Sequence, residues 1–285
     1  MTIKDILVHL DASPRSGAVL ALAAGLAGRH AAHLTAVHVV ELPTPAMFYG
    51  DPSGFIDPRL IDDLMTTMRE QGKKEAARLE QAFRERVSRD GIEGEWRLAE
   101  GFTAETVALH ARYADLTVVG QRDPDDKSLA SVGDVAATTL LSSGRPLLVL
   151  PYAGDFPAAG RKVLVGWKST RDASRAVNDA LPLLQQADEV TVLSINPEGG
   201  IDGDGDVPAA DIALHLARHG VKASAAHTVA KDIPEGDALL DYAEDIGADL
   251  IVAGGYGHSR ARELLFGGVT RTLLTTMTVP VFLSH

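Results

Sequence analysis

The sequence predicts an α/β protein built from two tandem domains, each an open five-stranded parallel sheet with helices on both faces. Two observations support this fold class. Short apolar runs alternate with longer segments whose apolar residues recur every three to four positions, a pattern typical of buried parallel strands separated by amphipathic helices. The same pattern occurs twice within 285 residues, a length that corresponds to about two domains of ordinary size.

The internal repeat can be measured by subtracting residue numbers. Three segments of the first copy align with counterparts in the second: 6–11 with 163–168, 114–120 with 248–254, and 145–150 with 279–284. The first pair is offset by 157 residues and the other two pairs by 134. The first copy therefore has 23 extra residues in its front half. We place the two domains at residues 1–152 and 161–285.

In the first copy, strands are expected at residues 6–10, 34–40, 96–98, 116–119 and 146–150. A helix follows the first strand, because Ser13 and Pro14 are typical of an N-cap and a first helical turn. Further helices are expected from residue 58, from residue 103 and up to residue 142. The extra residues include 42–45 and 48–52, which could form a lid or a partner surface. A longer crossover loop is the more common explanation of such length.

In the second copy, strands are expected at residues 163–167, 190–195, 223–228, 250–253 and 279–283. Helices are expected over residues 173–184, 209–219, 235–246 and 261–277. Between the two copies, residues 152–162 contain Gly, Pro and Ala without an apolar period. This segment is predicted to be the linker.

Composition excludes several functions. The formal net charge of −12 argues against a nucleic-acid or anionic-membrane partner, because both require a basic surface. The chain has no cysteine, which excludes disulfides and thiol catalysis and fits a reducing compartment. No apolar run approaches the roughly 18 residues of a membrane span, and the N-terminus does not look like a signal peptide. We therefore expect a soluble, cytoplasmic protein.

A glycine-rich turn after the strand at 250–253 is the strongest functional signal. It comprises residues 254–257 (GGYG) and, after nine further residues, 267–270 (GGVT). Glycines at a strand-to-helix turn let backbone N–H groups approach phosphate oxygens, and the helix N-terminus adds a partial positive charge. Open α/β sheets also bind ligands at the carboxyl ends of their strands. The segment is predicted to bind phosphate, with a turn whose glycines serve only packing as the alternative.

The equivalent turn of the first copy differs in charge. Asp123 stands where the second copy has Gly257, and Asp134 stands where it has Gly268. A carboxylate about 4 Å from a phosphate costs about 1 kcal/mol in water and about 4 kcal/mol near a protein surface. We therefore expect the first copy to bind no nucleotide, and one nucleotide per chain.

Three other features are weaker candidates. His215 and His219 lie four residues apart on an expected helix and resemble a metal pair, but a solvated helix face is favoured. Residues 202–206 (DGDGD) alternate like a calcium loop but lack the downstream glutamate, so an acidic surface turn is favoured. Lys168, at the end of a strand, could contact a phosphate or ribose or be a solvated strand end. No nucleophile elbow, Walker loop or HExxH motif is present.

These residues resemble the universal stress protein family in its tandem form, over essentially the whole chain. The family pattern is a glycine, two residues, a glycine, nine residues, a glycine, and then Ser or Thr. Here the pattern is Gly254, Gly257 and Gly267, with Gly268 where Ser or Thr is usual. The resemblance implies flavodoxin/Rossmann-like sheets, ATP bound along the strand ends, and dimers or pseudo-dimers formed partly through the last strands. The usual family aspartate near the end of the first strand is present as Asp11 but replaced by Lys168 in the second copy.

The resemblance implies an ATP-binding stress-response regulator, with nucleotide in the second copy and Mg²⁺ as an accompanying ion. The candidate nucleotide-binding residues are Gly254, Tyr256, Gly257, His258, Gly267, Gly268, Val269, Thr270, Val165 and Lys168. We expect at most slow ATP hydrolysis, because no general base or metal carboxylate stands near the turn. An unknown protein partner and a homodimer are compatible with this function. The alternative is a nucleotide-free, pseudo-symmetric scaffold, and an enzyme of the related adenine-nucleotide α-hydrolase group is less favoured.

Overall fold

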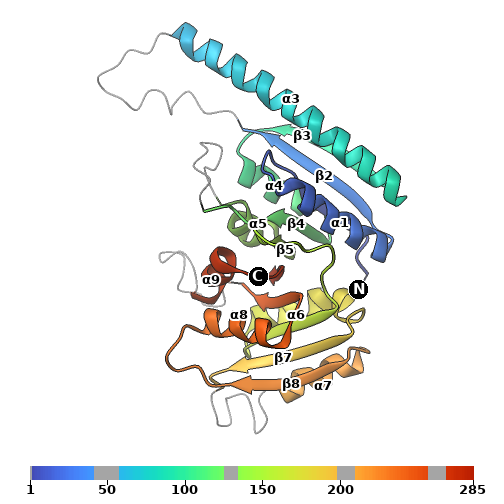
Figure 1. The fold of residues 1–285 in the computed structure, drawn as a ribbon, viewed down its shortest axis with the longest axis vertical. Coiled ribbons are helices and arrows are strands. Elements are labelled where there is room, and N and C mark those ends of the chain that lie inside the picture. Colours follow the sequence, from blue (N-terminus) through green and yellow to red (C-terminus); the bar gives the residue numbers. More distant parts are fainter. Residues whose placement is uncertain (1, 42–57, 125–133, 198–208, 256–267) are drawn as a thin grey trace.

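The computed structural model describes residues 2–41, 58–124, 134–197, 209–255 and 268–285 (Figure 1). Its strands are β1 (Asp5–His9), β2 (His33–Val40), β3 (Gly94–Glu100), β4 (Leu116–Gly120), β5 (Leu147–Leu150), β6 (Lys162–Trp167), β7 (Glu189–Ile195), β8 (Ala223–Thr228), β9 (Leu250–Gly254) and β10 (Val281–Ser284). Its helices are α1 (Ser16–His30), α3 (Pro58–Asp90), α4 (Thr103–Ala111), α5 (Val135–Ser143), α6 (Arg171–Leu184), α7 (Ala210–Arg218), α8 (Glu235–Ile246) and α9 (Gly268–Thr276). The predicted α/β fold class is confirmed.

The two expected sheets are joined into one. Within the described residues, the strand order is β3-β2-β1-β4-β5-β10-β9-β6-β7-β8. Strands are parallel within each copy, and β5 pairs with β10 in the antiparallel direction, with Phe282 opposite Leu148. The last strands of the two copies therefore meet across a pseudo-twofold junction. The short apolar strands 147–150 and 281–284 are fully buried, which explains why neither is left as an open edge.

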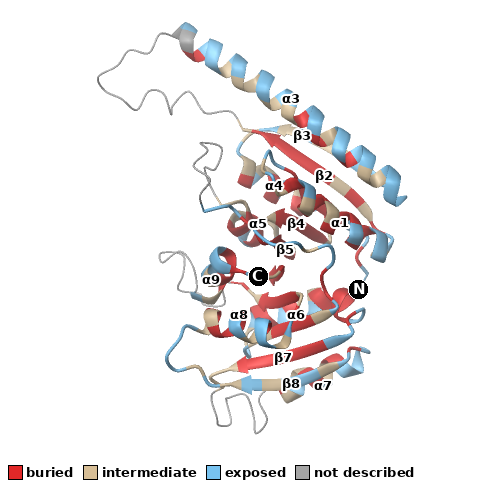
Figure 2. Ribbon diagram, in the orientation of Figure 1, coloured by how far each residue is buried: buried red, intermediate tan, exposed pale blue. Residues whose placement is uncertain are grey.

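Helices cover both faces of the sheet, and the buried residues run through the junction (Figure 2). One face carries α1, α3, α6 and α7, whose buried side chains form a single core with residues of both copies. On the opposite face, α5 of the first copy shares a core with α8 and α9 of the second. Because both of these cores contain residues of both copies, the two halves are expected to stabilise one another.

Helix α3 accounts for much of the extra length of the first copy. It has 33 residues, whereas α7 of the second copy has nine. Its apolar stripe packs on the sheet through Leu79 and Phe83, both almost fully buried. A Cβ atom on Gly72 would lie 2.6 Å from Val40 Cγ1, so glycine lets the helix cross close to the end of β2. The candidate lid residues 42–45 and 48–52 lie outside the described residues.

Matching hydrogen bonds at the strand starts support the repeat in three dimensions. In the first copy, the backbone N–H groups of Lys4 and Asp5 donate to Asp115 Oδ2 at 2.8 and 3.1 Å. In the second copy, the N–H group of Lys162 donates to Asp249 Oδ1 at 3.0 Å. Asp115 and Asp249 are 134 residues apart. One aspartate at the start of each fourth strand therefore fixes the start of each first strand.

The predicted N-cap at Ser13 is wrong. Helix α1 begins at Ser16, and its N-cap residue, Arg15, makes no side-chain cap hydrogen bond. Instead, the backbone N–H of Ser13 donates to Asp11 Oδ1 at 3.0 Å, and the hydroxyl of Ser16 donates to the carbonyl oxygen of Asp11 at 2.6 Å. These bonds form a turn that delays the start of the helix. None of the helices in the described part of the chain is both long enough and apolar enough to cross a membrane.

Candidate functional site

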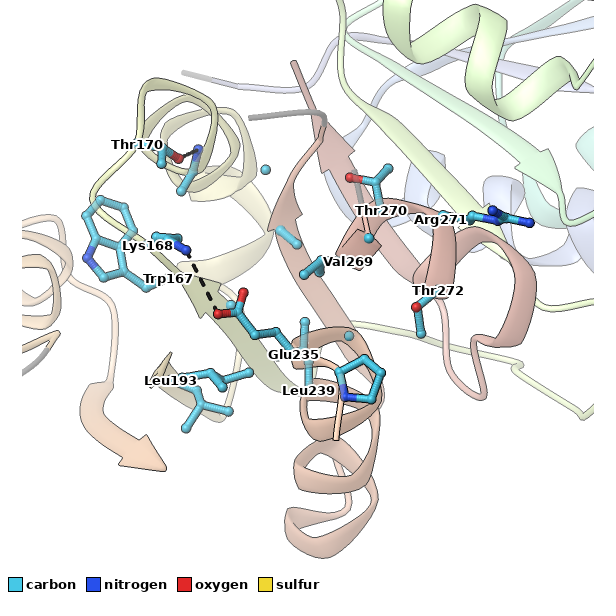
Figure 3. Close-up of a pocket in the computed structure, with 18 residues that line it drawn as sticks. Trp167, Lys168, Thr170, Leu193, Glu235, Leu239, Val269, Thr270, Arg271 and Thr272 are labelled. Carbon is cyan, nitrogen blue, oxygen red and sulfur yellow. Dashed lines mark hydrogen bonds and ion pairs between the residues drawn. The ribbon is translucent and has the colours of Figure 1, made fainter. Parts of the chain in front are cut away.

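A cavity of about 540 Å³ opens at the carboxyl ends of β6, β7 and β9, beside the N-termini of α6, α8 and α9 (Figure 3). Its lining residues are Gly166, Trp167, Lys168, Thr170, Ala173, Leu193, Ile195, Pro234, Glu235, Gly236, Leu239, Ala253, Gly254, Gly268, Val269, Thr270, Arg271 and Thr272. All of them belong to the second copy. The cavity lies where an open parallel sheet usually binds its ligand.

Apolar side chains form the interior of the cavity. Leu193 and Leu239 are buried on the sheet face that carries α8 and α9. Val269 lies toward the centre of the cavity, whereas the side chain of Arg271 points away from the other labelled residues (Figure 3). An interior of this kind suits the flat, weakly polar face of an aromatic ring more than a free ion.

An ion pair stands at the rim. Lys168 Nζ lies 3.9 Å from Glu235 Oε1, and Figure 3 shows the two side chains reaching toward each other across the opening. The side chains are 59% and 38% exposed, so the pair is solvated and contributes little to stability. Either group can exchange its partner for a ligand atom at low cost.

The first residues of α9 provide a place for an anion. Gly268, Val269 and Thr270 form its first turn and line the cavity. The backbone N–H groups of a first helical turn have no intrahelical acceptor, and the helix dipole makes this end positive. A Cβ atom on Gly268 would meet no atom of the described residues within 4 Å. The described residues therefore leave space beside this N-terminus that a phosphate group could occupy.

Packing explains the first glycine of the turn. A Cβ atom on Gly254 would lie 2.5 Å from Ala173 N and 2.6 Å from the carbonyl carbon of Asp172, both in the backbone of α6. Gly254 is thus needed for the close approach of α6 to the end of β9, whatever else it does. Gly166 also lines the cavity, and a Cβ atom there would lie 3.1 Å from Leu239 Cδ2.

The structure brings five of the predicted site residues together around this cavity: Gly254, Gly268, Val269, Thr270 and Lys168. Val165 does not line it. Its side chain is fully buried in the core on the α6 face of the sheet, because alternate residues of a strand point to opposite faces. The neighbouring Gly166 lines the cavity in its place. Tyr256, Gly257, His258 and Gly267 lie outside the described residues.

Sequence reasoning missed the cavity residues at the end of β7 and around the start of α8. Ile195, at the end of β7, and Pro234 and Glu235, before and at the start of α8, line the cavity. The rule that ligands bind at strand carboxyl ends applies to β7 as well as to β6 and β9, and could have identified Ile195. The position of Glu235 depends on how the loop before α8 returns to the sheet, for which the sequence contains no comparable signal.

The first copy has polar side chains where the second copy has two glycines of the cavity. By the offset of 157, His9 stands at the position of Gly166. His9 is 6% exposed, and burial lowers its pKa to about 4, with Asp11 opposing and His38 adding to the shift. Asp134, at the position of Gly268, accepts a hydrogen bond from Ala137 N at 3.1 Å and caps α5. Its carboxylate therefore occupies the N-terminus of α5, whereas the second copy has a glycine at the equivalent position.

The weaker candidates gain no support. The ring centroids of His215, on α7, and His219, its C-cap residue, lie 4.7 Å apart. Within the described ranges, no group of three or more His, Cys, Asp or Glu side chains is arranged to hold a metal ion. The acidic turn at residues 202–206 lies outside those ranges. The described residues define a tandem α/β protein with an open small-molecule cavity in its second half.

Comparison with known proteins identifies the family. The model of the universal stress protein family matches residues 2–151 and again residues 160–285. The chain therefore belongs to the universal stress protein family, in a tandem arrangement. No curated protein matches the sequence.

Two solved structures show the same fold over almost the whole chain. A universal stress protein from Archaeoglobus fulgidus DSM 4304 has a TM-score of 0.74 and 16% identity, covering 99% of this chain and 96% of that one. A functionally unknown protein from Pseudomonas aeruginosa PAO1 has a TM-score of 0.54 and 14% identity, covering 99% and 92%. A universal stress protein in complex with cAMP matches with a TM-score of 0.38 and 18% identity, covering 53% of this chain and 98% of its own.

Proposed function

We propose that this protein is an ATP-binding regulator of the stress response that holds one nucleotide in the cavity of its second copy. The observation that carries the proposal is the N-terminus of α9, whose first turn lines that cavity at the carboxyl ends of β6 and β9. Phosphate binding needs backbone N–H groups and room beside them, and Gly268 supplies both.

The size and lining of the cavity support a nucleotide. A volume of about 540 Å³ falls within the roughly 300–1,000 Å³ of small-molecule sites. In the proposed complex, the base lies against apolar side chains such as Leu193 and Leu239, and the phosphates lie at the first turn of α9. Glu235 at the rim can accept hydrogen bonds from ribose hydroxyl groups. In this complex the Lys168 ammonium group either contacts the phosphates or remains paired with Glu235.

Binding rather than catalysis is the proposed role. Among the described residues that line the cavity, Glu235 is the only carboxylate, and Lys168 is its ion-pair partner. A Mg²⁺ ion would therefore be held mainly by the phosphates, and ATP hydrolysis would be slow at most. Nucleotide occupancy would act by setting the conformation of the chain or its choice of protein partner.

Isothermal titration calorimetry with ATP and Mg²⁺ tests the proposal, and we expect one site per chain. Mass spectrometry of the purified, denatured protein would show whether ATP is retained from the cell. Because a member of the family has been solved with cAMP, cAMP is the first competitor to titrate. A lack of binding heat at high micromolar protein, together with no retained nucleotide, would contradict the proposal.

A nucleotide-free scaffold is the second candidate. The observation in its favour is that close packing against the backbone of α6 is sufficient to explain a glycine at position 254. Lys168 also stands where the family usually has an aspartate. The same titration separates the two candidates, because a scaffold would give no heat with any nucleotide while the chain remained folded.

A further inference from the structure

The junction between the copies reaches the candidate site at two points. One is Gly255, which directly follows Gly254 at the cavity wall. The other is α9, whose first turn lines the cavity and whose last turn contacts the first copy. We propose that the first copy positions the site of the second: Leu140 fixes the backbone at Gly255, and Gln121 fixes α9. This inference rests on the proposed function, since it concerns how the same site is held.

Leu140 packs closely against the backbone at the end of β9. A Cβ atom on Gly255 would lie 2.7 Å from Leu140 Cδ2 and 3.4 Å from its Cγ. Leu140 is 1% exposed and belongs to the core that α5 shares with α8 and α9. From the other side, Gly255 N–H donates to the carbonyl oxygen of Ser284 at 2.8 Å. The backbone of Gly255 is therefore confined between α5 of the first copy and β10.

Gln121 reaches across the junction to α9. Its Nε2 donates to the carbonyl oxygen of Leu274 at 2.9 Å, and its Oε1 accepts from Tyr152 N at 3.0 Å. Its own N–H donates to the carbonyl oxygen of Leu150 at 2.7 Å. The side chain is 7% exposed. A buried amide with both ends bonded is held rigidly, so the last turn of α9 is tied to the first copy.

The two contacts are related by the repeat. Gln121 and Gly255 are 134 residues apart, and so are Leu140 and Leu274. The same pair of positions thus meets twice across the pseudo-twofold junction. In one half, a glutamine side chain extends to the opposing helix. In the other half, glycine leaves the space that Leu140 occupies. A glutamine at position 255 would exclude Leu140 and remove its contact with the end of β9.

ATP affinity in four proteins tests this positioning role: the parent, Leu140→Ala, Gly255→Ala and the double variant. We expect Leu140→Ala to weaken ATP binding about five- to tenfold. Gly255→Ala should also weaken binding, because its Cβ collides with Leu140. Adding Leu140→Ala should restore part of that loss, since the smaller side chain makes room. Such non-additivity is the signature of direct contact. If the two losses simply multiply, the proposal is overturned.

The control is Leu141→Ala. Leu141 is the next residue of α5 and is 47% exposed, so its removal should change the affinity less than twofold. If Leu140→Ala fails to fold, Leu140→Met replaces it in the test. We expect Leu140→Met to bind ATP nearly as tightly as the parent does. A parent that binds no ATP contradicts the proposed function, and this inference fails with it. If a folded Leu140→Ala protein binds ATP as tightly as the parent does, the inference is overturned while the proposed function stands.

Hydrogen exchange tests the same coupling in the opposite direction. If the first copy holds the site, ATP in the second copy must stabilise the junction in return. We expect ATP to slow exchange of the Tyr152 amide, whose acceptor is Gln121 Oε1, several-fold in the parent. The amide of Lys4, at the far strand start, should exchange at the same rate with and without ATP. Unchanged protection of Tyr152 in ATP-saturated protein would overturn the inference.

Discussion

The two copies have the same fold but differ at the carboxyl ends of their strands. In the first copy, His9 occupies the space beside the first strand and Asp134 caps α5. In the second, the corresponding Gly166 and Gly268 leave a cavity of about 540 Å³. Two glycines of the cavity are thus replaced by polar side chains in the first copy, while the strands around them pair in the same way.

Gly268→Asp gives the second copy the residue of the first and should have the largest effect. A Cβ atom at this position meets no atom of the described residues within 4 Å, so these residues leave room for the substitution. Its carboxylate would lie at the N-terminus of α9, where the phosphates are proposed to bind. Repulsion of about 4 kcal/mol between this carboxylate and a phosphate at about 4 Å corresponds to a loss of ATP affinity of about 10²- to 10³-fold. Isothermal titration calorimetry with ATP measures this loss of affinity.

The matched control for this substitution is Gly268→Asn, which has the same shape without the charge. We expect Gly268→Asn to weaken ATP binding less than tenfold. The melting temperature of the nucleotide-free Gly268→Asp protein should be at least that of the parent, because an acidic residue favours a helix N-terminus. Equal affinities of the parent and Gly268→Asp would contradict the phosphate site at α9.

His9 makes the stability of the first copy depend on pH. Its pKa is about 4 in the folded chain, below the ordinary value of 6.5, mainly because burial disfavours the charged ring. The unfolded chain therefore binds the proton more readily. This contribution to stability is fully present above pH 6.5 and is lost as the pH falls toward 4. The maximum loss is about 3 kcal/mol.

Urea unfolding between pH 4 and 7 measures this dependence. Removing the titrating group by His9→Gln should flatten the pH profile over that window. His227→Gln, which removes an exposed histidine of β8, should leave the profile as it is in the parent. Parallel profiles for the parent and His9→Gln would show that another group sets the acid sensitivity.

Equivalent glycines at the ends of β4 and β9 provide the next comparison. A Cβ atom on Gly254 would lie 2.5 Å from Ala173 N, in a helix backbone that cannot move alone. At the equivalent Gly120, the nearest atom is Val19 Cγ2 at 3.4 Å, an ordinary contact. Gly254→Ala should therefore lower the free energy of unfolding by about 2–3 kcal/mol. Gly120→Ala should change it by less than about 0.5 kcal/mol.

Denaturant titration of the two alanine variants measures this difference. Equal changes would mean that α6 can shift away from β9 at little cost, and would remove the packing explanation of Gly254. In that case phosphate binding would be the stronger reason for glycine at this position.

The order of the elements and the place of the cavity could be predicted from the sequence. The repeat offsets give the equivalent strands, and strand carboxyl ends mark where a ligand binds. The joining of two sheets through β5 and β10 depends on contacts between distant segments, and only the family resemblance indicated it. The packing role of Gly254 could not be predicted, because it depends on the distance between α6 and β9. The position of Glu235 at the rim depends in the same way on the loop before α8.

The smallest predicted effect concerns the start of the first helix in each copy. Thr170 and Ser13 are 157 residues apart and occupy equivalent positions. Thr170 caps α6, because its Oγ1 accepts a hydrogen bond from Ala173 N at 3.3 Å. Ser13 caps no helix, since α1 begins only at Ser16. Thr170→Ala should therefore cost about 1 kcal/mol, and Ser13→Ala less than about 0.5 kcal/mol.

Thermal and urea unfolding without nucleotide measure this difference, because Thr170 also lines the cavity and bound ATP would add its own stabilisation. Thr170→Ser keeps the capping oxygen and should recover most of the loss. If Ser13→Ala and Thr170→Ala destabilise the chain equally, the turn around Asp11 supports α1 as strongly as a side-chain cap supports α6. The two copies would then differ in how their first helix starts but not in how well that start is stabilised.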